Sequence, residues 1–393
     1  MNPTLLNTEI QAFINNNINS EIAKLILGGT TFNDVDTKEV IEQIEAKKRS
    51  VKKLPTWFKK ENIYWPNKLN IEQTSSEITA KYKSTIISGK SLIDVTGGFG
   101  VDTYYFSQHV DSVIHCEIDN KLSKIVAHNF KELEISNIKC LNESGIDALK
   151  RLDQQFDWVY VDPSRRDKTK NKVFLLTDCT PDVKIFQHLF LVYAKNVMVK
   201  TSPLLDISAT LFALNHITEI YVVAVNNEVK ELLWILQRDY EGDVLIKTIN
   251  LQKDKNPQIY NFKLADEAIN IAQYHLPLNY LYEPNSAILK AGAFNSLSYD
   301  LDVYKLHKHS HLYTSKELID FPGRRFKIEK ILPFNKKLFA KEKITKGNIT
   351  TRNFPLTVAE IRKKFKIKDG GDIYLFFTTN LDEEKTIVVC SKI

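Results

Sequence analysis

From residue 91 to about residue 263 the sequence alternates between short runs typical of buried strands and longer runs with helical periodicity. This alternation predicts βαβ units, in which parallel strands form one sheet and helices cover both of its faces. In such a sheet ligands bind beyond the carboxyl ends of the strands, so the loops that follow strands are the candidate site. We expect strands at 91–95, 112–117, 137–141, 157–162, 196–200, 219–225, 244–250 and 258–263.

The segments on either side have different patterns. Residues 1–85 show helical periodicity, and their Gly28-Gly29 pair predicts a helix stop. A helical pattern at 358–365, a Gly370-Gly371 turn and strand-like runs near the C-terminus predict a small α+β domain that ends in a hairpin. The predicted organisation is an N-terminal helical extension (1–85), a Rossmann-like doubly wound α/β domain (86–264), a connecting segment (265–320) and the α+β domain (321–393).

Composition excludes several classes of protein. No apolar stretch approaches the roughly 20 residues of a membrane helix, and the first residues lack the basic and apolar regions of a signal peptide. We therefore expect no membrane contact and a cytoplasmic location. The four cysteines lack C-x-x-C spacing, which argues against a zinc site and a disulfide framework, so no metal is expected; they are Cys116, Cys140, Cys179 and Cys390.

A glycine-rich loop follows the first expected strand. Asp94 ends the apolar run, and three glycines in four positions allow the backbone to approach a ligand closely. The dinucleotide fingerprint G-x-G-x-x-G does not match, because its third glycine would fall at Thr103. An acid before the glycines suits a cofactor without a pyrophosphate, such as S-adenosylmethionine (SAM), whose ammonium needs a negative charge. The predicted cofactor-binding residues here are Asp94, Thr96, Gly97, Gly98, Phe99 and Gly100.

The second and third expected strands also end in polar residues. Glu117 follows Asp94 by 23 positions, and its two carboxylate oxygens can accept hydrogen bonds from both hydroxyls of a ribose. Ile118 can pack on an adenine face, although an isoleucine here is equally ordinary in a core. After the third strand, Glu143 or Ser144 is the candidate for the adenine amino group.

The fourth expected strand ends in Asp162-Pro163, followed by Ser164, Arg165 and Arg166. Proline fixes its own φ and holds the preceding residue extended, which places Asp162 at the strand tip. A carboxylate there can accept a hydrogen bond from a nucleophile and orient its lone pair, so Asp162 and Pro163 are the predicted catalytic pair. The two arginines keep their charge and suit phosphate groups of a substrate. The alternative is a strand-ending turn with an arginine–carboxylate pair.

Together these motifs resemble those of class I SAM-dependent methyltransferases: the loop from Asp94 to Gly100, then Glu117, then Asp162-Pro163. Residues 162–167 and 72–77 are similar to a bacterial branch with a ferredoxin-like segment and a C-terminal THUMP-like domain. Residues 321–326 and 366–371 resemble that terminal domain. The resemblance implies SAM as cofactor and an RNA-modifying role, because true THUMP domains help to place RNA.

Two departures restrict the chemistry. Amino-group methylases of adenine usually carry a second proline and an aromatic ring where this chain has Ser164 and Arg165. Carbon-5 pyrimidine methylation uses a cysteine nucleophile, and the loop at Asp162 contains none; Cys179 lies 17 residues further on and is interpreted as structural. The methylated atom is therefore not predicted.

Charge is unevenly distributed along the chain. Residues 321–393 hold 17 Lys and Arg against 8 Asp and Glu, whereas the whole chain carries a net charge of +6. This asymmetry is typical of a nucleic-acid-binding appendage, although a solvated basic surface gives the same pattern. Basic and aromatic residues also alternate at 46–68; they can bind single strands by stacking, but we favour tryptophans that pin the extension onto the next domain.

The leading hypothesis is therefore a SAM-dependent methyltransferase of tRNA or rRNA, with the basic C-terminal domain assisting RNA binding. The alternatives are a methyltransferase of small molecules or proteins, and a non-catalytic RNA-binding protein that keeps the fold. A nicotinamide oxidoreductase is disfavoured by the missing fingerprint glycine and by Asp162-Pro163.

Overall fold

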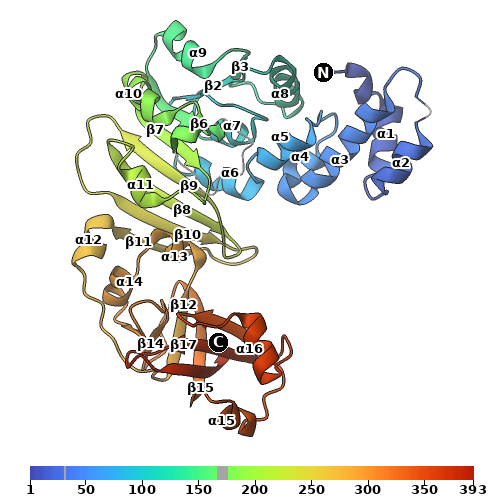
Figure 1. Ribbon diagram of the computed structural model, residues 1–393. Helices are drawn as coiled ribbons and strands as arrows, with labels where there is room; N and C mark the ends of the chain where they lie inside the picture. Colours follow the sequence, from blue (N-terminus) through green and yellow to red (C-terminus); the bar gives the residue numbers. More distant parts are fainter. Residues whose placement is uncertain (31, 166–175) are drawn as a thin grey trace. The chain divides into compact units, whose positions relative to one another are not determined.

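The computed structural model describes residues 1–30, 32–165 and 176–393 (Figure 1). The chain divides into two compact units, one made of Met1–Ile217 with Leu233–Glu241 and the other of Thr218–Leu232 with Gly242–Ile393. Each sheet is described separately below. Among the described residues no helix is long and apolar enough to cross a membrane.

The N-terminal segment is helical, as predicted. Asn7, Asp36 and Ser76 each accept a backbone hydrogen bond at a helix start, and Gly29 ends the second helix at φ +66°. The elements are η1 (Pro3–Leu6), α1 (Thr8–Asn16), α2 (Ile22–Gly28), α3 (Thr37–Lys53), α4 (Pro55–Lys59), α5 (Lys68–Gln73) and α6 (Glu77–Ser84).

These helices share one core with the start of the α/β region. Trp57 and Trp65 are buried, and their rings lie 5.0 and 6.2 Å from the ring of Phe99. Ile44 from α3 and Phe130 from the helix that follows the second strand belong to the same apolar cluster. The prediction that the tryptophans pin the extension is therefore confirmed.

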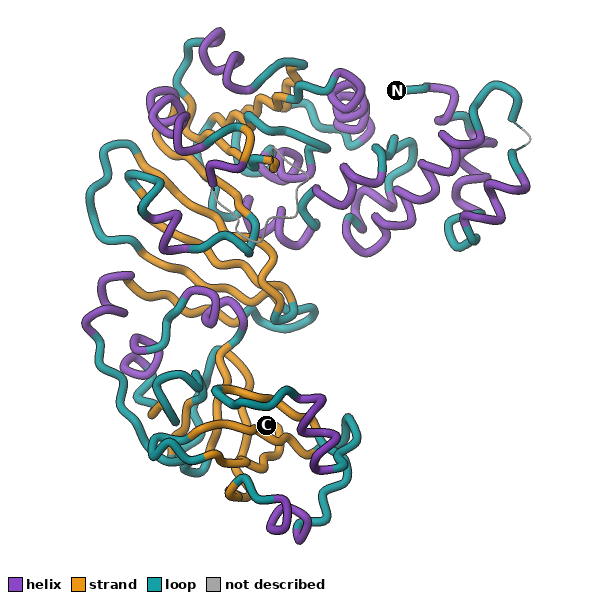
Figure 2. Tube along the Cα trace, in the orientation of Figure 1, coloured by secondary structure: helices purple, strands orange, loops and turns teal. Residues whose placement is uncertain are grey.

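A nine-stranded sheet follows, in the order β11-β10-β8-β9-β7-β4-β1-β2-β3. Figure 2 draws the strands of the chain in orange. Its strands are β1 (Ser91–Asp94), β2 (Ser112–Cys116), β3 (Ile138–Leu141), β4 (Phe156–Val161), β7 (Ala194–Thr201), β8 (Ile217–Val225), β9 (Glu228–Gln237), β10 (Leu245–Leu251) and β11 (Gln258–Lys263). The connecting helices are α7 (Val101–Phe106), α8 (Asn120–Glu132), α9 (Gly145–Leu152), α10 (Val183–Tyr193) and α11 (Ile207–Leu211). The short elements β5 (Ser164–Arg165), η2 (Leu176–Asp178) and β6 (Cys179–Thr180) lie between β4 and α10.

The parallel sheet was predicted, and its order places a switch point beside β1. Strands β1, β2 and β3 succeed one another in one direction, and β4 then pairs with the other side of β1. All of these pairs are parallel, as is the pair of β4 and β7. The crevice at the carboxyl ends of β1 and β4 is therefore where this architecture binds ligands.

Strand β9 is absent from the sequence prediction. It follows β8 after only Asn226 and Asn227, whose φ angles are +50° and +65°. Two successive residues with positive φ make the tight hairpin turn that asparagine favours, so β8 and β9 run antiparallel. The Asn-Asn pair between two apolar runs was the signal that the sequence prediction overlooked.

The second unit contains a seven-stranded sheet in the order β13-β14-β12-β15-β18-β17-β16. Its strands are β12 (Tyr280–Pro284), β13 (Tyr304–Lys305), β14 (Tyr313–Ser315), β15 (Gly323–Pro333), β16 (Asn348–Arg352), β17 (Ile373–Thr379) and β18 (Lys385–Lys392). Its helices are α12 (Leu264–Ile269), α13 (Ser286–Ala291), α14 (Asn295–Asp300), α15 (Lys336–Lys341) and α16 (Val358–Phe365).

This sheet joins two segments that the sequence prediction separated. Strand β12 of the connecting segment pairs antiparallel with β15, which opens the terminal domain. The predicted terminal hairpin is present as β17 and β18, and α16 begins with a capping box between Thr357 and Glu360. The connecting segment begins with the short helix α12, which ends at Ile269.

Candidate functional site

Backbone amides of the loop after β1 donate hydrogen bonds to the end of β2. The amide of Gly97 donates to the carbonyl of Cys116 at 2.8 Å, and the amide of Gly98 donates to the Glu117 carboxylate at 2.9 Å. Gly100 adopts a left-handed conformation (φ +79°) and begins α7. The loop is therefore fixed against the end of β2, where the sequence placed the second site residue.

Two of the loop glycines are required by packing. A Cβ on Gly97 would lie 2.2 Å from Nε2 of the buried His115, and one on Gly100 would lie 2.6 Å from the Phe130 ring. By contrast, a Cβ on Gly98 would meet nothing closer than 3.8 Å, although its φ of +56° favours glycine. Gly98 is thus the glycine around which the loop leaves open space.

Phe99 turns its side chain inward. The ring is 3% exposed and packs between Trp57 and Trp65 of the N-terminal helices. Its predicted role in cofactor binding is therefore restricted to its backbone, since its ring belongs to the core.

Asp94 is also turned inward. Its side chain is buried, and its two oxygens accept hydrogen bonds from the amide of Thr96 at 3.0 Å and from the Thr103 hydroxyl at 2.7 Å. Burial raises the pKa of Asp94 to about 7, against the two hydrogen bonds, which lower it. The buried carboxyl group of Asp94 therefore holds the loop in place through hydrogen bonds made inside the protein.

Glu117 spans the loops after β1 and β2. One carboxylate oxygen accepts from Gly98 and the other accepts from the amide of Asp119 at 2.7 Å. Burial raises the pKa of Glu117, while these backbone donors oppose that shift. Each oxygen keeps a second lone pair, so contact with a ribose hydroxyl is still available.

Ile118 is 75% exposed. The alternative that it is a core residue is therefore wrong. The adjacent Asn142, which the sequence reasoning missed, donates from its amide to the carbonyls of Glu117 and Ile118 at 2.9 and 3.2 Å. Asn142 thus ties the loop after β3 to the loop after β2.

The two candidates after β3 differ. Glu143 forms an ion pair with Arg151, and this pairing lowers the pKa of Glu143. Ser144 stands at the start of α9 without a side-chain capping bond. Gly145 lies against β1, because a Cβ there would meet the backbone of Val95 at 2.3 Å.

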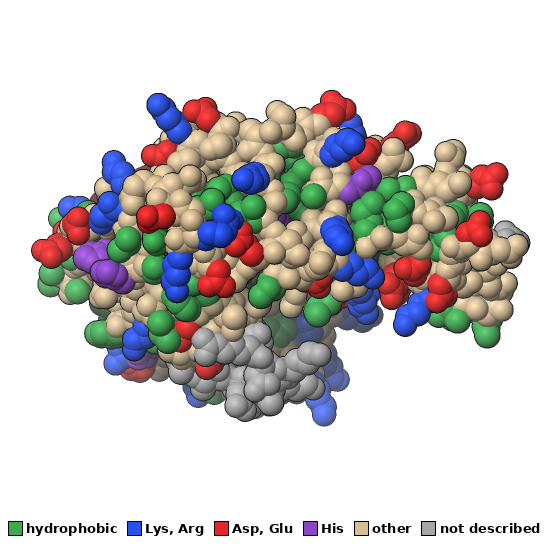
Figure 3. All heavy atoms as spheres, turned by 90° about the horizontal axis from the view of Figure 1, so that it is seen from above, with side chains coloured by type: hydrophobic (Ala, Val, Ile, Leu, Met, Phe, Trp, Pro, Cys, Tyr) green, Lys and Arg blue, Asp and Glu red, His purple; other side chains and the backbone are tan. Residues whose placement is uncertain are grey.

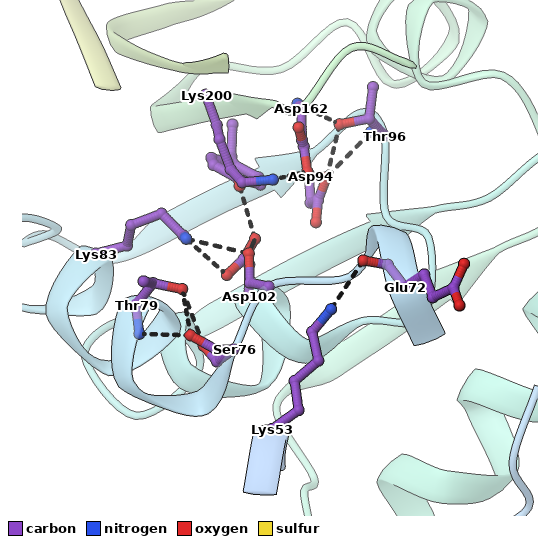
Figure 4. A network of polar contacts seen from close by, with 12 residues as sticks. Lys53, Glu72, Ser76, Thr79, Lys83, Asp94, Thr96, Asp102, Asp162 and Lys200 are labelled. Carbon is purple, nitrogen blue, oxygen red and sulfur yellow. Dashed lines mark hydrogen bonds and ion pairs between the residues drawn. The ribbon is translucent and has the colours of Figure 1, made fainter. Parts of the chain in front are cut away.

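Asp162 lies at the tip of β4 and is only partly buried. Its amide donates to the Thr96 hydroxyl at 2.7 Å, and its Oδ2 accepts from Nζ of Lys200 at 2.5 Å (Figure 4). The same Thr96 hydroxyl lies 3.4 Å from Oδ1 of Asp94. Thr96, predicted as a cofactor residue, thereby connects the loop after β1 to the tip of β4.

Lys200 is the main candidate residue that the sequence reasoning missed. It stands near the end of β7, the strand beside β4, and its side chain is 13% exposed. A lysine near the end of an apolar strand is a sequence signal for a site residue. The sequence does not reveal which carboxylate it pairs with, because that depends on the order of the strands in the sheet. The ion pair fixes one oxygen of Asp162, and the structure describes no partner for its Oδ1.

A second lysine–aspartate pair lies deeper in the same network (Figure 4). Lys83 from α6 is buried, and its ammonium lies 3.2 Å from Oδ1 of Asp102 on α7. Oδ2 of Asp102 accepts from the hydroxyls of Ser75 and Tyr160, each at 2.7 Å. Burial raises the pKa of Asp102, but the charges of Lys83 and Lys200 and the two hydroxyl donors together lower it below its usual value. The N-terminal extension therefore contributes part of the site's support.

Lys53, at the end of α3, belongs to the same region. Its ammonium donates to the carbonyls of Ile71 and Glu72 at 2.7 and 2.9 Å. Burial, together with the neighbouring charge of Lys200, lowers the pKa of Lys53 to about 8.

The predicted substrate-binding arginines are only partly covered by the structure. The backbone of Arg165 forms β5 and pairs with Cys179 of β6. Arg166 lies outside the described residues.

Three family models match the chain. Residues 51–188 match conserved hypothetical protein 95, residues 280–322 a ferredoxin-like domain, and residues 323–392 a THUMP domain-like family. A solved protein of Porphyromonas gingivalis W83, provisionally named a methyltransferase, is 31% identical to this chain with a TM-score of 0.89. The match covers 100% of this chain and 99% of that one. The chain belongs to this methyltransferase family.

Other matches to this methyltransferase are partial. A Streptococcus mutans protein, provisionally named a methyltransferase and solved with SAH, is 13% identical and covers 41% of this chain and 96% of its own, with a TM-score of 0.31. A Streptococcus thermophilus rRNA methylase is 9% identical over 41% of this chain and 94% of its own, with a TM-score of 0.30. Likenesses this weak support no argument about the chain. No curated protein matches it.

Proposed function

We propose that this methyltransferase uses SAM and acts on RNA, with Asp162 as the catalytic residue. The observation that carries the proposal is the partly open Asp162 at the tip of β4, beside the glycine loop and with one oxygen fixed by Lys200. Both features stand at the switch point of the sheet, where this architecture binds ligands.

The residues around the loop fit SAM. Glu117 offers its remaining lone pairs to the ribose hydroxyls, and the exposed Ile118 can cover an adenine face. Gly98 leaves space for the backbone to approach the cofactor. Ser144, whose hydroxyl makes no capping bond, is favoured over Glu143 for the adenine amino group. When bound, SAM supplies an electrophilic methyl group.

Asp94 acts on this cofactor through the loop. Both of its oxygens accept hydrogen bonds from threonines, and its side chain is buried. A role of Asp94 that acts through water or through the loop is therefore favoured over direct contact with the ammonium.

Asp162 orients the nucleophile. Its Oδ1 can accept a hydrogen bond from a substrate N–H or O–H, which aligns the lone pair for attack on the methyl carbon. Lys200 prevents the carboxylate from rotating and compensates its charge in a partly buried place. Pro163 holds the strand end extended, and Arg165 and Arg166 are proposed to contact substrate phosphates.

The RNA substrate is proposed from the C-terminal part of the chain. The THUMP-like match at 323–392 and the surplus of 17 basic over 8 acidic residues at 321–393 support it. On the face seen in Figure 3, basic and acidic side chains are interspersed. One alternative function is methylation of small molecules or proteins. A second alternative is a non-catalytic RNA-binding protein that keeps the methyltransferase fold.

One experiment separates these functions. The protein is incubated with methyl-labelled SAM and, in parallel, with RNA, protein and small-molecule fractions of cells that lack the gene. Label in RNA, identified by mass spectrometry of nucleosides, is the expected result. Label found only in the protein or small-molecule fraction would contradict the proposal of an RNA substrate. Absence of SAM binding in calorimetry would contradict the proposal that the protein uses SAM.

A further inference from the structure

The second unit contains an open groove of about 990 Å³. Its lining comes from the turn between β8 and β9, the loop between β10 and β11, the start of β15 and the end of β18. This volume is at the upper end of the range of small-molecule pockets, and the groove is open to solvent. All of its lining residues belong to the second unit.

The lining is strongly basic. It contains five cationic side chains and one acidic side chain, Asp320; the cations are Lys253, Lys255, Arg324, Arg325 and Lys392. The three lysines are exposed, and none has an ion-pair partner among the described residues. Three free ammonium groups along one groove attract a ligand with several negative charges.

One arginine of the groove is fixed in place. The carboxylate of the buried Glu283 accepts from Arg324 at 2.6 Å and from Arg352 at 2.8 Å. One buried carboxylate thus compensates two guanidinium groups, each about one-third exposed, so the cluster keeps a positive charge. A guanidinium that is already immobilised loses little entropy when it binds an anion.

The walls of the groove are linked by side-chain hydrogen bonds and expose no aromatic ring for stacking. The side-chain amides of Asn250 and Asn285 both donate to Gln258, at 3.0 and 3.4 Å, and Gln258 donates to the carbonyl of Gly323. The two aromatic residues of the lining, Tyr260 and Phe321, are buried. Bases therefore cannot stack here, and recognition depends on charge.

We propose that this groove binds the phosphodiester backbone of base-paired RNA through Lys253, Lys255 and Lys392. Paired RNA presents phosphates at regular spacing and keeps its bases stacked on each other, which suits a cationic groove without exposed rings. The identity of the ligand rests on the proposed RNA substrate, but the binding itself is measurable without methyl transfer.

The test is the binding of a fluorescein-labelled RNA duplex to the full chain, followed by anisotropy between about 50 and about 200 mM salt. The triple variant Lys253→Glu, Lys255→Glu, Lys392→Glu is compared with a control of equal charge change in the same unit. The control replaces three exposed lysines at α15 with glutamate, namely Lys336, Lys337 and Lys341.

We expect the groove variant to lose at least about a hundredfold in affinity at about 100 mM salt, and its log–log salt slope to fall by about three. A milder variant with glutamine at the three groove positions should show a smaller loss in the same direction. Equal losses in the groove and α15 variants, or an unchanged slope, overturn the proposal. Calorimetry with SAM runs in parallel, so failure of the proposed methyltransferase is seen independently of RNA binding.

Discussion

The loops after β1 and β4 each contain an aspartate at the end of a central strand, and the two residues have opposite environments. Asp94 is 1% exposed and hydrogen-bonded to two threonines, whereas the side chain of Asp162 is 31% exposed and paired with Lys200. Thr96 contacts both residues. Two aspartates at the ends of neighbouring strands thus have different environments: Asp94 is enclosed by the loop, and Asp162 is partly open to solvent.

From this difference we infer that the proposed site separates support from chemistry. A buried carboxylate with both oxygens occupied holds a loop, while a carboxylate with one oxygen fixed can act on a substrate with the other. The same contrast exists between the buried pair Lys83–Asp102 and the partly open pair Lys200–Asp162. The following predictions test this separation.

The largest expected effect is on methyl transfer. Asp162→Ala should lower the rate of RNA methylation about 10²- to 10⁴-fold, because the group that orients the nucleophile is lost. SAM binding, measured by calorimetry, should be unchanged. Asp111→Ala, which alters an exposed aspartate before β2, is the control and should keep full activity. Normal transfer by Asp162→Ala would show that the assigned role is wrong.

The next effect is on stability as a function of pH. The pKa of Asp94 is about 7 in the folded chain and about 4 when unfolded, so the folded state binds more protons between these values. The pH-dependent stabilisation that Asp94 contributes is complete below about pH 4 and is lost as the pH rises to about 7. Above pH 7 the contribution of Asp94 to the free energy of unfolding does not change further. The loss is at most about 1.4 kcal/mol per pH unit.

Urea unfolding of the wild type and of Asp94→Asn measures this effect. The free energy of unfolding of the wild type, relative to the variant, should be lower at pH 8 than at pH 5. An identical difference at both pH values would mean that Asp94 ionises in the folded chain as it does in water.

The loop glycines should respond in different ways. Gly97→Ala forces a methyl group onto His115 and should destabilise the chain by about 1–3 kcal/mol. That cost should shrink in a His115→Ala background, where the space is available. Gly98→Ala should cost about 1–2 kcal/mol through its positive φ, with no dependence on His115. Chemical denaturation of the three single variants and of the two double variants with His115→Ala decides between packing and backbone strain.

The smallest effect is expected at Ile118. Because its side chain is mostly exposed, Ile118→Ala should leave the free energy of unfolding within about 0.5 kcal/mol of the wild type. Loss of the apolar surface that covers adenine should weaken SAM binding by about 1 kcal/mol, or about fivefold in Kd. Unchanged affinity in calorimetry would remove Ile118 from the cofactor site.

Much of the fold could be predicted because its patterns are local. The strands β1 to β4 begin and end within two residues of their expected bounds, and Gly29 ends α2 as expected. Strand β9 was missed because a helix–strand alternation favours parallel connections, whereas Asn226 and Asn227 build an antiparallel hairpin.

The site could be predicted only in part. Asp94, Thr96, Glu117 and Asp162 come together because parallel strands end at one edge of the sheet, which the sequence pattern implies. Lys200 and Lys83 could not be assigned, because their partners lie 38 and 19 positions away in the chain. Such pairings depend on which strand or helix becomes a neighbour.

The sequence by itself determined the alternation of strands and helices, the acid-first glycine loop and the carboxylate at the tip of β4. These features follow from backbone propensities and side-chain periodicity, which act over a few residues. Only the tertiary structure decided which aspartate is buried, that Phe99 faces the core, and which lysine fixes Asp162. Burial and ion pairing depend on segments far apart in the chain, so the packed structure alone determines them.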